Sequence, residues 1–273
     1  MMIYDCFLFF NEFELLEVRL NTLSEYVDKF VLIESGHTFQ GQEKPLWYRV
    51  NQSQFDRFAN RIIHVNVDLG TTLNDRSYQG GWDREHATRM AIARVLADRP
   101  RDDIVLLSDI DEIPDLRGWS PEDVPCVWWH RLFYYYVNLE CCQSDGRSCR
   151  WKGTVAAPLG TFFEDPKIQG DGQKFRDWRH YDVRRVIEDT RGGWHFSYLG
   201  GTQRIIEKIN AFAHAELLSH ATPENVDRAI TEGWKEGIDL FNRKLYQFAV
   251  ILDDSGLPPY LTANKERFRH LWK

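Results

Sequence analysis

Short apolar runs alternate with amphipathic segments through the first half of the chain. Uninterrupted apolar runs are typical of strands buried on both faces, whereas apolar residues spaced three and four positions apart are typical of amphipathic helices. This pattern predicts strands at 3–10, 30–34, 62–67 and 104–108, and helices at 12–25 and 84–98. Repeated strand–helix–strand units of this size favour an α/β fold with a mostly parallel central sheet and helices on both faces.

The second half of the chain is richer in aromatic residues, which crowd the segment 126–139. Here the pattern predicts strands at 155–163 and 194–198, and helices at 202–218 and 223–232. No linker rich in Pro, Gly or Ser divides the chain, so we expect a single domain over residues 1–273.

The segment Ile104–Pro114, IVLLSDIDEIP, is the most informative for chemistry. An apolar strand runs directly into Asp109 and Asp111, a D-x-D pair that Glu112 follows. Alternate side chains of a strand share a face, so we expect the two aspartates to lie roughly 7 Å apart at the sheet edge where open α/β sheets bind ligands. Such a pair can hold one divalent cation and the anion it carries. The alternative is an acidic turn that caps the next segment.

Composition limits the possible partners. The chain has 273 residues, of which 43% are hydrophobic, enough for a full core. Its formal charge of -7 and its pI near 5.7 argue against a surface that neutralises nucleic-acid phosphates. No apolar segment approaches the ~18 residues that cross a bilayer, and no targeting segment precedes the first strand, so we expect a soluble, cytoplasmic protein.

The cysteines and the aromatic residues each allow two interpretations. Five cysteines without paired C-x-x-C spacing predict free thiols, or one incidental disulfide, rather than a zinc site. Large rings usually fill the core, but some can instead floor a sugar site. The aromatic residues concerned are Trp128, Trp129, Tyr134, Tyr135, Tyr136 and Trp151.

Four blocks carry a resemblance to a known family: residues 4–46, GGWDREHATRM at 80–90, DDIVLLSDIDEIP at 102–114 and GGWHFSY at 192–198. In this order they resemble glycosyltransferase family 17. The resemblance implies a GT-A type fold, a UDP-sugar donor such as UDP-GlcNAc, a divalent metal (Mn²⁺ or Mg²⁺) and inversion at the anomeric carbon. The partners it implies are a nucleotide sugar and a glycan acceptor.

The resemblance also divides the domain and suggests metal ligands. We expect a nucleotide-sugar-binding half at 1–115, an acceptor half at 116–200 and a helical extension at 201–273. Asp111 is the first candidate for the metal, and Asp109 is expected to contact either the metal or the donor. His195 is expected to complete the metal shell, although a histidine between Trp and Phe is often only a buried, hydrogen-bonded residue. Glu112 either supports the site or pairs with a basic neighbour.

Several polar residues are candidates for contacts with the donor. Asn11, Glu12 and Glu34 follow predicted strands at the edge where a nucleotide would rest, although helix capping is the alternative for Asn11 and Glu12. Basic residues are candidates for the diphosphate oxygens, with solvated surface charge as the alternative; these are Lys44, Arg84 and Arg89. Arg89 is also spaced to pair with Glu85 on the same helix.

Inversion requires a general base that takes the proton of the acceptor hydroxyl. The first candidates are Glu164 and Asp165, because a strand at 155–163 would deliver them to the same sheet edge, and Asp171 is a further candidate from the same region. Glu85 and Glu140 are reserve candidates.

Two other functions use the same features: a non-catalytic carbohydrate-binding or nucleotide-sugar-binding protein, and a metal-dependent nucleotidyltransferase. The second would require a Gly-rich phosphate loop that the segment after Phe10, NEFELLEV, does not provide.

Overall fold

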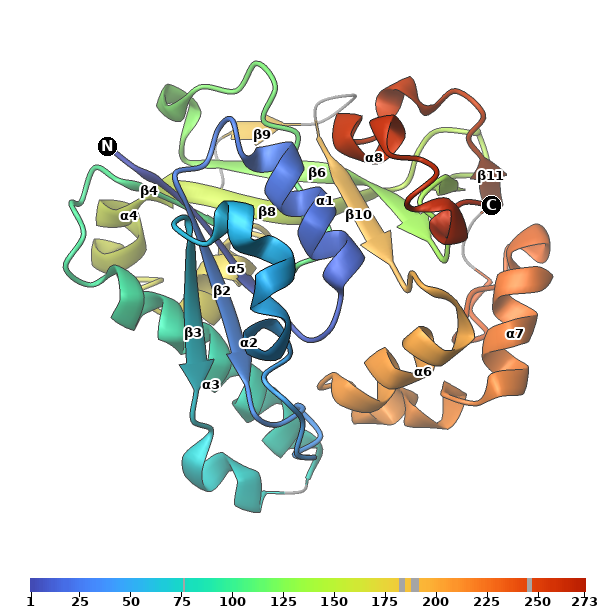
Figure 1. Ribbon diagram of the computed structural model, residues 1–273, viewed down its shortest axis with the longest axis horizontal. Helices are drawn as coiled ribbons and strands as arrows, with labels where there is room; N and C mark the ends of the chain where they lie inside the picture. The colour runs from blue at the N-terminus through green and yellow to red at the C-terminus, as the bar shows by residue number, and fades with distance from the viewer. Residues whose placement is uncertain (76, 182–184, 188–191, 245–246) are drawn as a thin grey trace.

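The computed structural model describes residues 1–75, 77–181, 185–187, 192–244 and 247–273, and one sheet runs through this part of the chain (Figure 1). The strands are β1 Ile3–Leu8, β2 Lys29–Ser35, β3 Ile62–Val67, β4 Ile104–Leu107, β5 Glu112–Ile113, β6 Cys126–Tyr134, β7 Leu139–Cys142, β8 Arg150–Pro158, β9 Arg185–Ile187, β10 Trp194–Ser197 and β11 Gln247–Val250. The helices are α1 Phe13–Leu23, α2 Trp47–Asn51, α3 Tyr78–Leu96, α4 Leu159–Glu164, α5 Gly172–Trp178, α6 Gly201–Ala211, α7 Pro223–Thr231 and α8 Pro259–Ala263.

The sheet is mixed, and the prediction of a mostly parallel sheet is wrong. Its main path runs β11-β7-β6-β8-β4-β1-β2-β3. The strands β4, β1, β2 and β3 are parallel to one another, as the strand–helix pattern predicted. The next strand, β8, pairs antiparallel with both β4 and β6. Periodicity reports the burial of a strand but not its direction, so the pattern could not detect this reversal.

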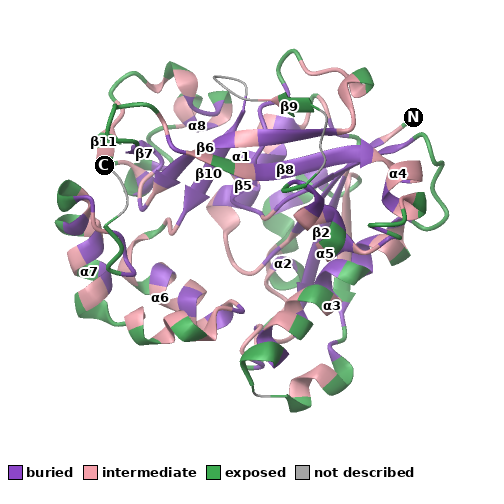
Figure 2. Ribbon diagram, turned by 180° about the vertical axis from the view of Figure 1, so that it is seen from behind, coloured by how far each residue is buried: buried purple, intermediate pink, exposed green. Residues whose placement is uncertain are grey.

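Helices cover both faces of the parallel part. Along β4, Leu106 packs in the cluster that contains Leu16 of α1, whereas Val105 and Leu107 pack in the cluster with Ile92 of α3 and Phe175 of α5. This alternation explains why β4 is apolar at every position: both of its faces are covered. Figure 2 shows the central strands buried and the outer turns of the helices exposed.

The C-terminal part combines helices with a strand. The predicted helix at 202–218 ends at Ala211 in the structure, and α6 and α7 pack together around the small cluster that includes Ile209 and Val226. The extension at 201–273 was expected to be helical, but β11 within it pairs with β7 at the sheet edge. Among the described residues, no helix combines the length and the apolar character needed to cross a membrane. All five cysteines are buried free thiols.

A strand was predicted at 155–163. In the structure, residues 155–158 form the last part of β8, and residues 159–163 belong to helix α4. Because β8 is antiparallel to β4, its carboxyl end lies at the sheet edge opposite to the end of β4. Glu164 therefore closes a helix at that opposite edge, 3.6 Å from Arg101 and with 70% of its side chain exposed. The prediction that this strand brings Glu164 and Asp165 to the acidic tip of β4 is wrong.

Gly193 allows β10 to enter the sheet next to the acidic segment. β10 pairs with β6 on one side and with the short β5 on the other. A Cβ atom on Gly193 would overlap the Ile113 carbonyl oxygen and lie 2.7 Å from the Asp115 nitrogen, and Gly193 has a φ of +87°. The position where the chain passes β5 therefore requires a residue that has no Cβ atom and readily adopts the left-handed backbone conformation, which is glycine.

We expect Gly193→Ala to lower the free energy of unfolding by about 2–4 kcal/mol, because it adds steric overlap to the strain of a positive φ. The matched control is Gly118→Ala: Gly118 also has a positive φ (+72°), but a Cβ there meets nothing within 4 Å. This control should cost only about 1 kcal/mol. Urea denaturation of both variants measures the difference, and equal losses would contradict a special role for the close approach at Gly193.

Candidate functional site

The acidic residues lie in a turn rather than on a strand. β4 ends at Leu107 and the chain turns through Asp109 to Asp111 before β5 begins at Glu112. The turn is closed by a hydrogen bond from the Glu112 nitrogen to the Asp109 carbonyl (3.0 Å), and the Asp109 nitrogen donates to the Glu112 carboxylate (3.0 Å). The prediction that Asp109 and Asp111 share one face of a strand is therefore wrong, although both stand at its carboxyl end.

Arg19 holds this turn from inside the protein. Its side chain is fully buried, and it forms an ion pair with the equally buried Asp5 of β1 (2.6 Å). The same guanidinium group donates to the carbonyl oxygens of Asp109 (2.9 Å) and Glu112 (2.9 Å) and to the Ser108 hydroxyl (2.8 Å). In sequence, Arg19 is a charged residue on the apolar side of α1. Its burial ties α1, β1 and the acidic turn into one unit.

A pocket of about 500 Å³ opens at the carboxyl ends of β1, β2 and β4, and residues of β6, β8 and β10 close its other side. Carboxylates and basic side chains line it in equal number. The carboxylates are Glu12, Glu34, Glu85, Asp109, Asp111 and Glu112, and the basic side chains are Lys44, Arg89, Arg176, Arg179, Lys208 and Arg243. The pocket is thus close to neutral in an acidic protein, and its surface alternates between the two charges.

Asp109 is engaged by two arginines from different helices. Arg89 of α3 donates to one carboxylate oxygen (2.8 Å), and Arg176 of α5 donates to the other. Burial by itself would raise the pKa of the Asp109 carboxyl, but the guanidinium groups of Arg176 and Arg89 outweigh burial and hold that pKa well below its ordinary value. Asp109 is therefore ionised and fixed, and both of its oxygens are occupied.

Glu112 is the most enclosed of the three acids. Its carboxylate accepts hydrogen bonds from the indole of Trp151 and from Arg179 (3.3 Å). Burial opposes ionisation, but Arg176 and Arg179 overcome it and lower the pKa of Glu112 to about 2. Of the two roles expected for Glu112, the structure shows the pairing with basic neighbours.

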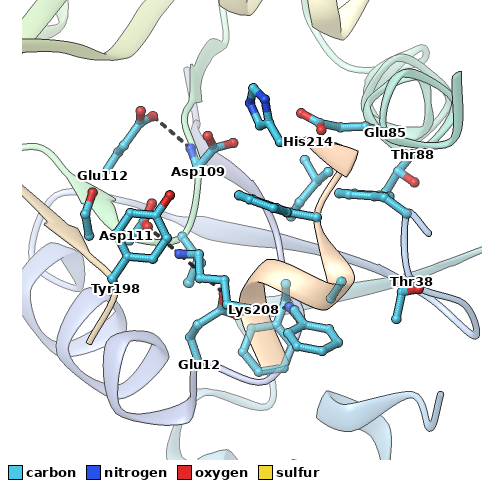
Figure 3. A pocket seen from close by; sticks show the side chains of 18 of the residues that line it. Glu12, Thr38, Glu85, Thr88, Asp109, Asp111, Glu112, Tyr198, Lys208 and His214 are labelled. Atoms are coloured by element: carbon cyan, nitrogen blue, oxygen red, sulfur yellow. Dashed lines mark hydrogen bonds and ion pairs between the residues drawn. The ribbon is translucent and has the colours of Figure 1, made fainter. Parts of the chain in front are cut away.

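Asp111 faces Lys208 and His195. One carboxylate oxygen lies 2.7 Å from the Lys208 ammonium nitrogen, and the other lies 3.8 Å from His195 Nε2. Figure 3 shows Lys208 of α6 between Asp111 and Glu12, which is 3.9 Å away. Burial lowers the pKa of Lys208, but Asp111 and Glu12 more than offset it, so the pKa rises above its ordinary value. Lys208 is therefore a cation held between two carboxylates.

His195 is suited to donate a lone pair. Burial lowers its pKa below the ordinary value, with the neighbouring Asp111 acting in the opposite direction, so the imidazole is neutral near pH 7. Its Nε2 lies 3.1 Å from the Ser197 hydroxyl, and its buried Nδ1 has no hydrogen-bond partner. A neutral histidine beside a carboxylate is the donor set that a divalent cation takes.

Asp111 and His195 can face one divalent cation, because the Asp111 oxygen that does not pair with Lys208 is the one turned toward the histidine. Two atoms that bind one cation lie roughly 3–4 Å apart, which matches the separation of 3.8 Å between Asp111 and His195. Asp109 is less suited, because Arg89 and Arg176 each bond one of its oxygens and their positive charges oppose a further cation. No group of three or more His, Cys, Asp or Glu side chains arranged for a metal occurs in the described part of the chain. A cation bound here would therefore need oxygen atoms from outside the protein to complete its coordination shell.

The other residues expected to contact a donor occupy different positions. Glu34 and Lys44 line the pocket; Glu34 also accepts from His64 (2.8 Å), and burial lowers the pKa of Lys44. Asn11 lines a second, smaller cavity and donates to Glu207 (3.3 Å). Arg84 is absent from the pocket lining because it donates to main-chain carbonyl oxygens of Phe39 (2.6 Å), Thr72 and Asp75.

The candidates for the general base lie in different parts of the structure, and most of them lie outside the pocket. Asp171 caps the start of α5 and lies 3.1 Å from His86. Glu140 forms an ion pair with Arg131 (2.7 Å). Together with Glu164 and Asp165, these carboxylates are absent from the pocket lining, whereas the reserve candidate Glu85 is part of it.

The sequence interpretation missed the cations that meet the acidic turn. Arg176 and Arg179 come from a short helix and its end, and Lys208 lies 97 residues from Asp111 in sequence. The spacing of the two arginines, three positions apart, indicates one helix face, but nothing local predicts where that face points.

Comparison with known proteins agrees with the resemblance seen in the sequence. Residues 1–124 match the model of Glycosyltransferase family 17. Curated relatives are the proteins named beta-1,4-mannosyl-glycoprotein 4-beta-N-acetylglucosaminyltransferase of Rattus norvegicus and Homo sapiens, each 32% identical over 96% of this chain. The chain spans about half the length of these relatives, 52% and 53% respectively. The predicted resemblance to this family is thus confirmed.

We expect Arg19→Met to lower the free energy of unfolding by about 3–5 kcal/mol, because it leaves the Asp5 carboxylate buried without a partner. The double variant Asp5→Leu/Arg19→Met should recover part of this loss, because it removes the unpaired charge as well. A double-mutant cycle by chemical denaturation measures the coupling. Strictly additive losses would show that the pair does not act as a unit.

Proposed function

We propose that this chain, whose residues 1–124 match the model of Glycosyltransferase family 17, is a metal-dependent, inverting transferase that moves N-acetylglucosamine from UDP-GlcNAc to a glycan hydroxyl. The relatives' name supports the sugar and the β linkage. The observation that carries the metal-dependent part is the pairing of Asp111 with a neutral His195 in the wall of the pocket.

The arrangement of the sheet supports a GT-A type fold. The parallel strands β1, β2 and β4 end at the pocket, as the strands of nucleotide-binding α/β sheets do. Ser35 and Lys44 line the part of the pocket beyond β1 and β2, where the nucleotide of the donor would lie. Lys44 and Arg89 supply positive charge on that side.

The pocket residues around the acidic turn would have different roles in binding the departing diphosphate. Asp111 and His195 would hold the metal, which when bound supplies positive charge to the departing UDP. Asp109 keeps Arg89 and Arg176 in place, and each of its oxygens accepts a bond from one of them. Lys208 lies beside Asp111 and provides a second positive charge at the same point.

Inversion is supported by the β linkage in the relatives' name together with the α configuration of UDP-GlcNAc. The reaction then requires a base that takes the proton of the acceptor hydroxyl as its oxygen attacks. Glu85 is the one among the predicted candidates that lines the pocket, where it forms the ion pair with Arg89 that the helix spacing predicted. In Figure 3 it lies across the pocket from Asp111 and Lys208. We therefore assign the role of base to Glu85 within this proposal.

We expect Asp111→Asn and His195→Ala each to weaken Mn²⁺ binding, measured by calorimetry in the presence of UDP, by at least about ten-fold. Hydrolysis of UDP-GlcNAc should fall in parallel. Asp165→Asn is the control, because it removes an acid outside the pocket lining and should leave both readouts unchanged. Unaltered Mn²⁺ affinity in both pocket variants, or turnover that is insensitive to a chelator, would refute the metal assignment.

We expect Glu85→Gln to lower kcat for transfer by about 10²- to 10⁴-fold with little change in the KM for UDP-GlcNAc, because the amide cannot accept the proton. Glu164→Gln, at the opposite sheet edge, is the matched control and should retain activity. The anomeric coupling in the product's NMR spectrum tests inversion. An α-linked product would rule out a single displacement, and full activity of Glu85→Gln would exclude Glu85 as the base.

A further inference from the structure

Two of the clustered aromatic residues, Tyr134 and Trp151, line the pocket, and Trp151 is the more exposed of the two, whereas others of the cluster are core residues. Trp128 and Tyr135 are buried, at 0% and 2% exposure, and contribute to the core. Trp151 of β8 differs: it lines the pocket and is 38% exposed. A large apolar ring that remains exposed inside a charged pocket requires an explanation, because burial of its surface would be favourable.

Contacts on several sides fix the orientation of this ring. The indole nitrogen donates to the Glu112 carboxylate. The ring centroid lies 5.0 Å from that of His195, and the guanidinium carbon of Arg179 lies 5.5 Å from it. A ring held in this way loses little conformational entropy when a ligand packs on it, which is a property of preorganised binding sites.

The sheet order places Trp151 on the side of the acidic turn away from the proposed nucleotide position. β4 lies between β1 and β8 in the sheet, so β1 and β2 are on one side of the turn and β8 is on the other. His195, which contacts both Asp111 and the Trp151 ring, connects the two sides. A molecule on Trp151 would therefore lie next to the sugar end of a donor whose nucleotide rests over β1 and β2.

We propose that Trp151 is the platform for the acceptor, and that a pyranose ring of the acceptor glycan stacks on the indole. This inference rests on the proposed function. The C–H groups of a pyranose face match the apolar surface of an indole, while sugar hydroxyl groups can meet the polar groups around it. Tyr134 and Ser197, which line the same side of the pocket, carry hydroxyl groups suited to such contacts. Trp151 thus determines which acceptors bind rather than which donors.

The test compares Trp151→Ala with Trp151→Phe. The acceptor is a soluble oligosaccharide with a terminal β-1,4-mannosyl residue, chosen from the relatives' name. We expect Trp151→Ala to raise the KM for this acceptor about ten-fold while the KM for UDP-GlcNAc and its hydrolysis by water stay near wild type. Trp151→Phe keeps an aromatic ring but loses the bond to Glu112, so it should retain most of the acceptor affinity.

Tyr181→Ala is the control, because Tyr181 is 80% exposed and lies outside the pocket lining. It should leave the acceptor KM unchanged. Equal loss in the Phe and Ala variants, or a parallel fall in donor hydrolysis, would overturn the proposal, because Trp151 would then act by positioning Glu112 or His195. An unchanged acceptor KM in Trp151→Ala would overturn it as well.

Calorimetry with the oligosaccharide alone separates this proposal from the proposed function. Binding by the wild-type protein that Trp151→Ala weakens supports the platform even if no transfer is detected. Active transfer with equal oligosaccharide binding in both proteins supports the enzyme and rejects the platform.

Discussion

The buried ion pair of Arg19 and Asp5 is the constraint on which the rest of the site depends. A guanidinium group in the interior is stable only if its donors are satisfied, and every nitrogen of Arg19 donates to Asp5, to Ser108 or to a carbonyl of the acidic turn. The turn between β4 and β5 is consequently held by its main chain. The side chains of Asp109 and Asp111 face the pocket, where cations of other helices pair with them.

The second principle of the site is charge compensation by distant elements. The acidic turn alone would place several carboxylates in a partly buried space, at a high electrostatic cost. Arg89 of α3, Arg176 of α5 and Lys208 of α6 offset that cost, each paired with Asp109 or Asp111. The charges of the pocket are therefore balanced within the protein, and its cations are held in fixed positions.

The change of strand direction between β4 and β8 gives the pocket two different walls. On the parallel side, the ends of β1 and β2 contribute mainly loops and acids such as Glu34. On the antiparallel side, β8 presents Trp151 from within the strand rather than from its end. One wall is thus built from strand ends and loops, and the other carries an aromatic ring from the middle of the sheet. The same reversal moves Glu164 and Asp165 to the opposite edge.

The sequence by itself determined the strands β1 to β4, the helices α1 and α3 and the position of Asp109 and Asp111 after β4, because apolar periodicity reports local burial directly. The strand predicted at 194–198 also placed β10 and with it His195. Only the tertiary structure decided that β8 runs antiparallel, that Lys208 meets Asp111 across 97 residues, and that Arg19 pairs inside the core. These features depend on pairings between distant segments, and the pattern of a single segment contains no information about its partner or its direction.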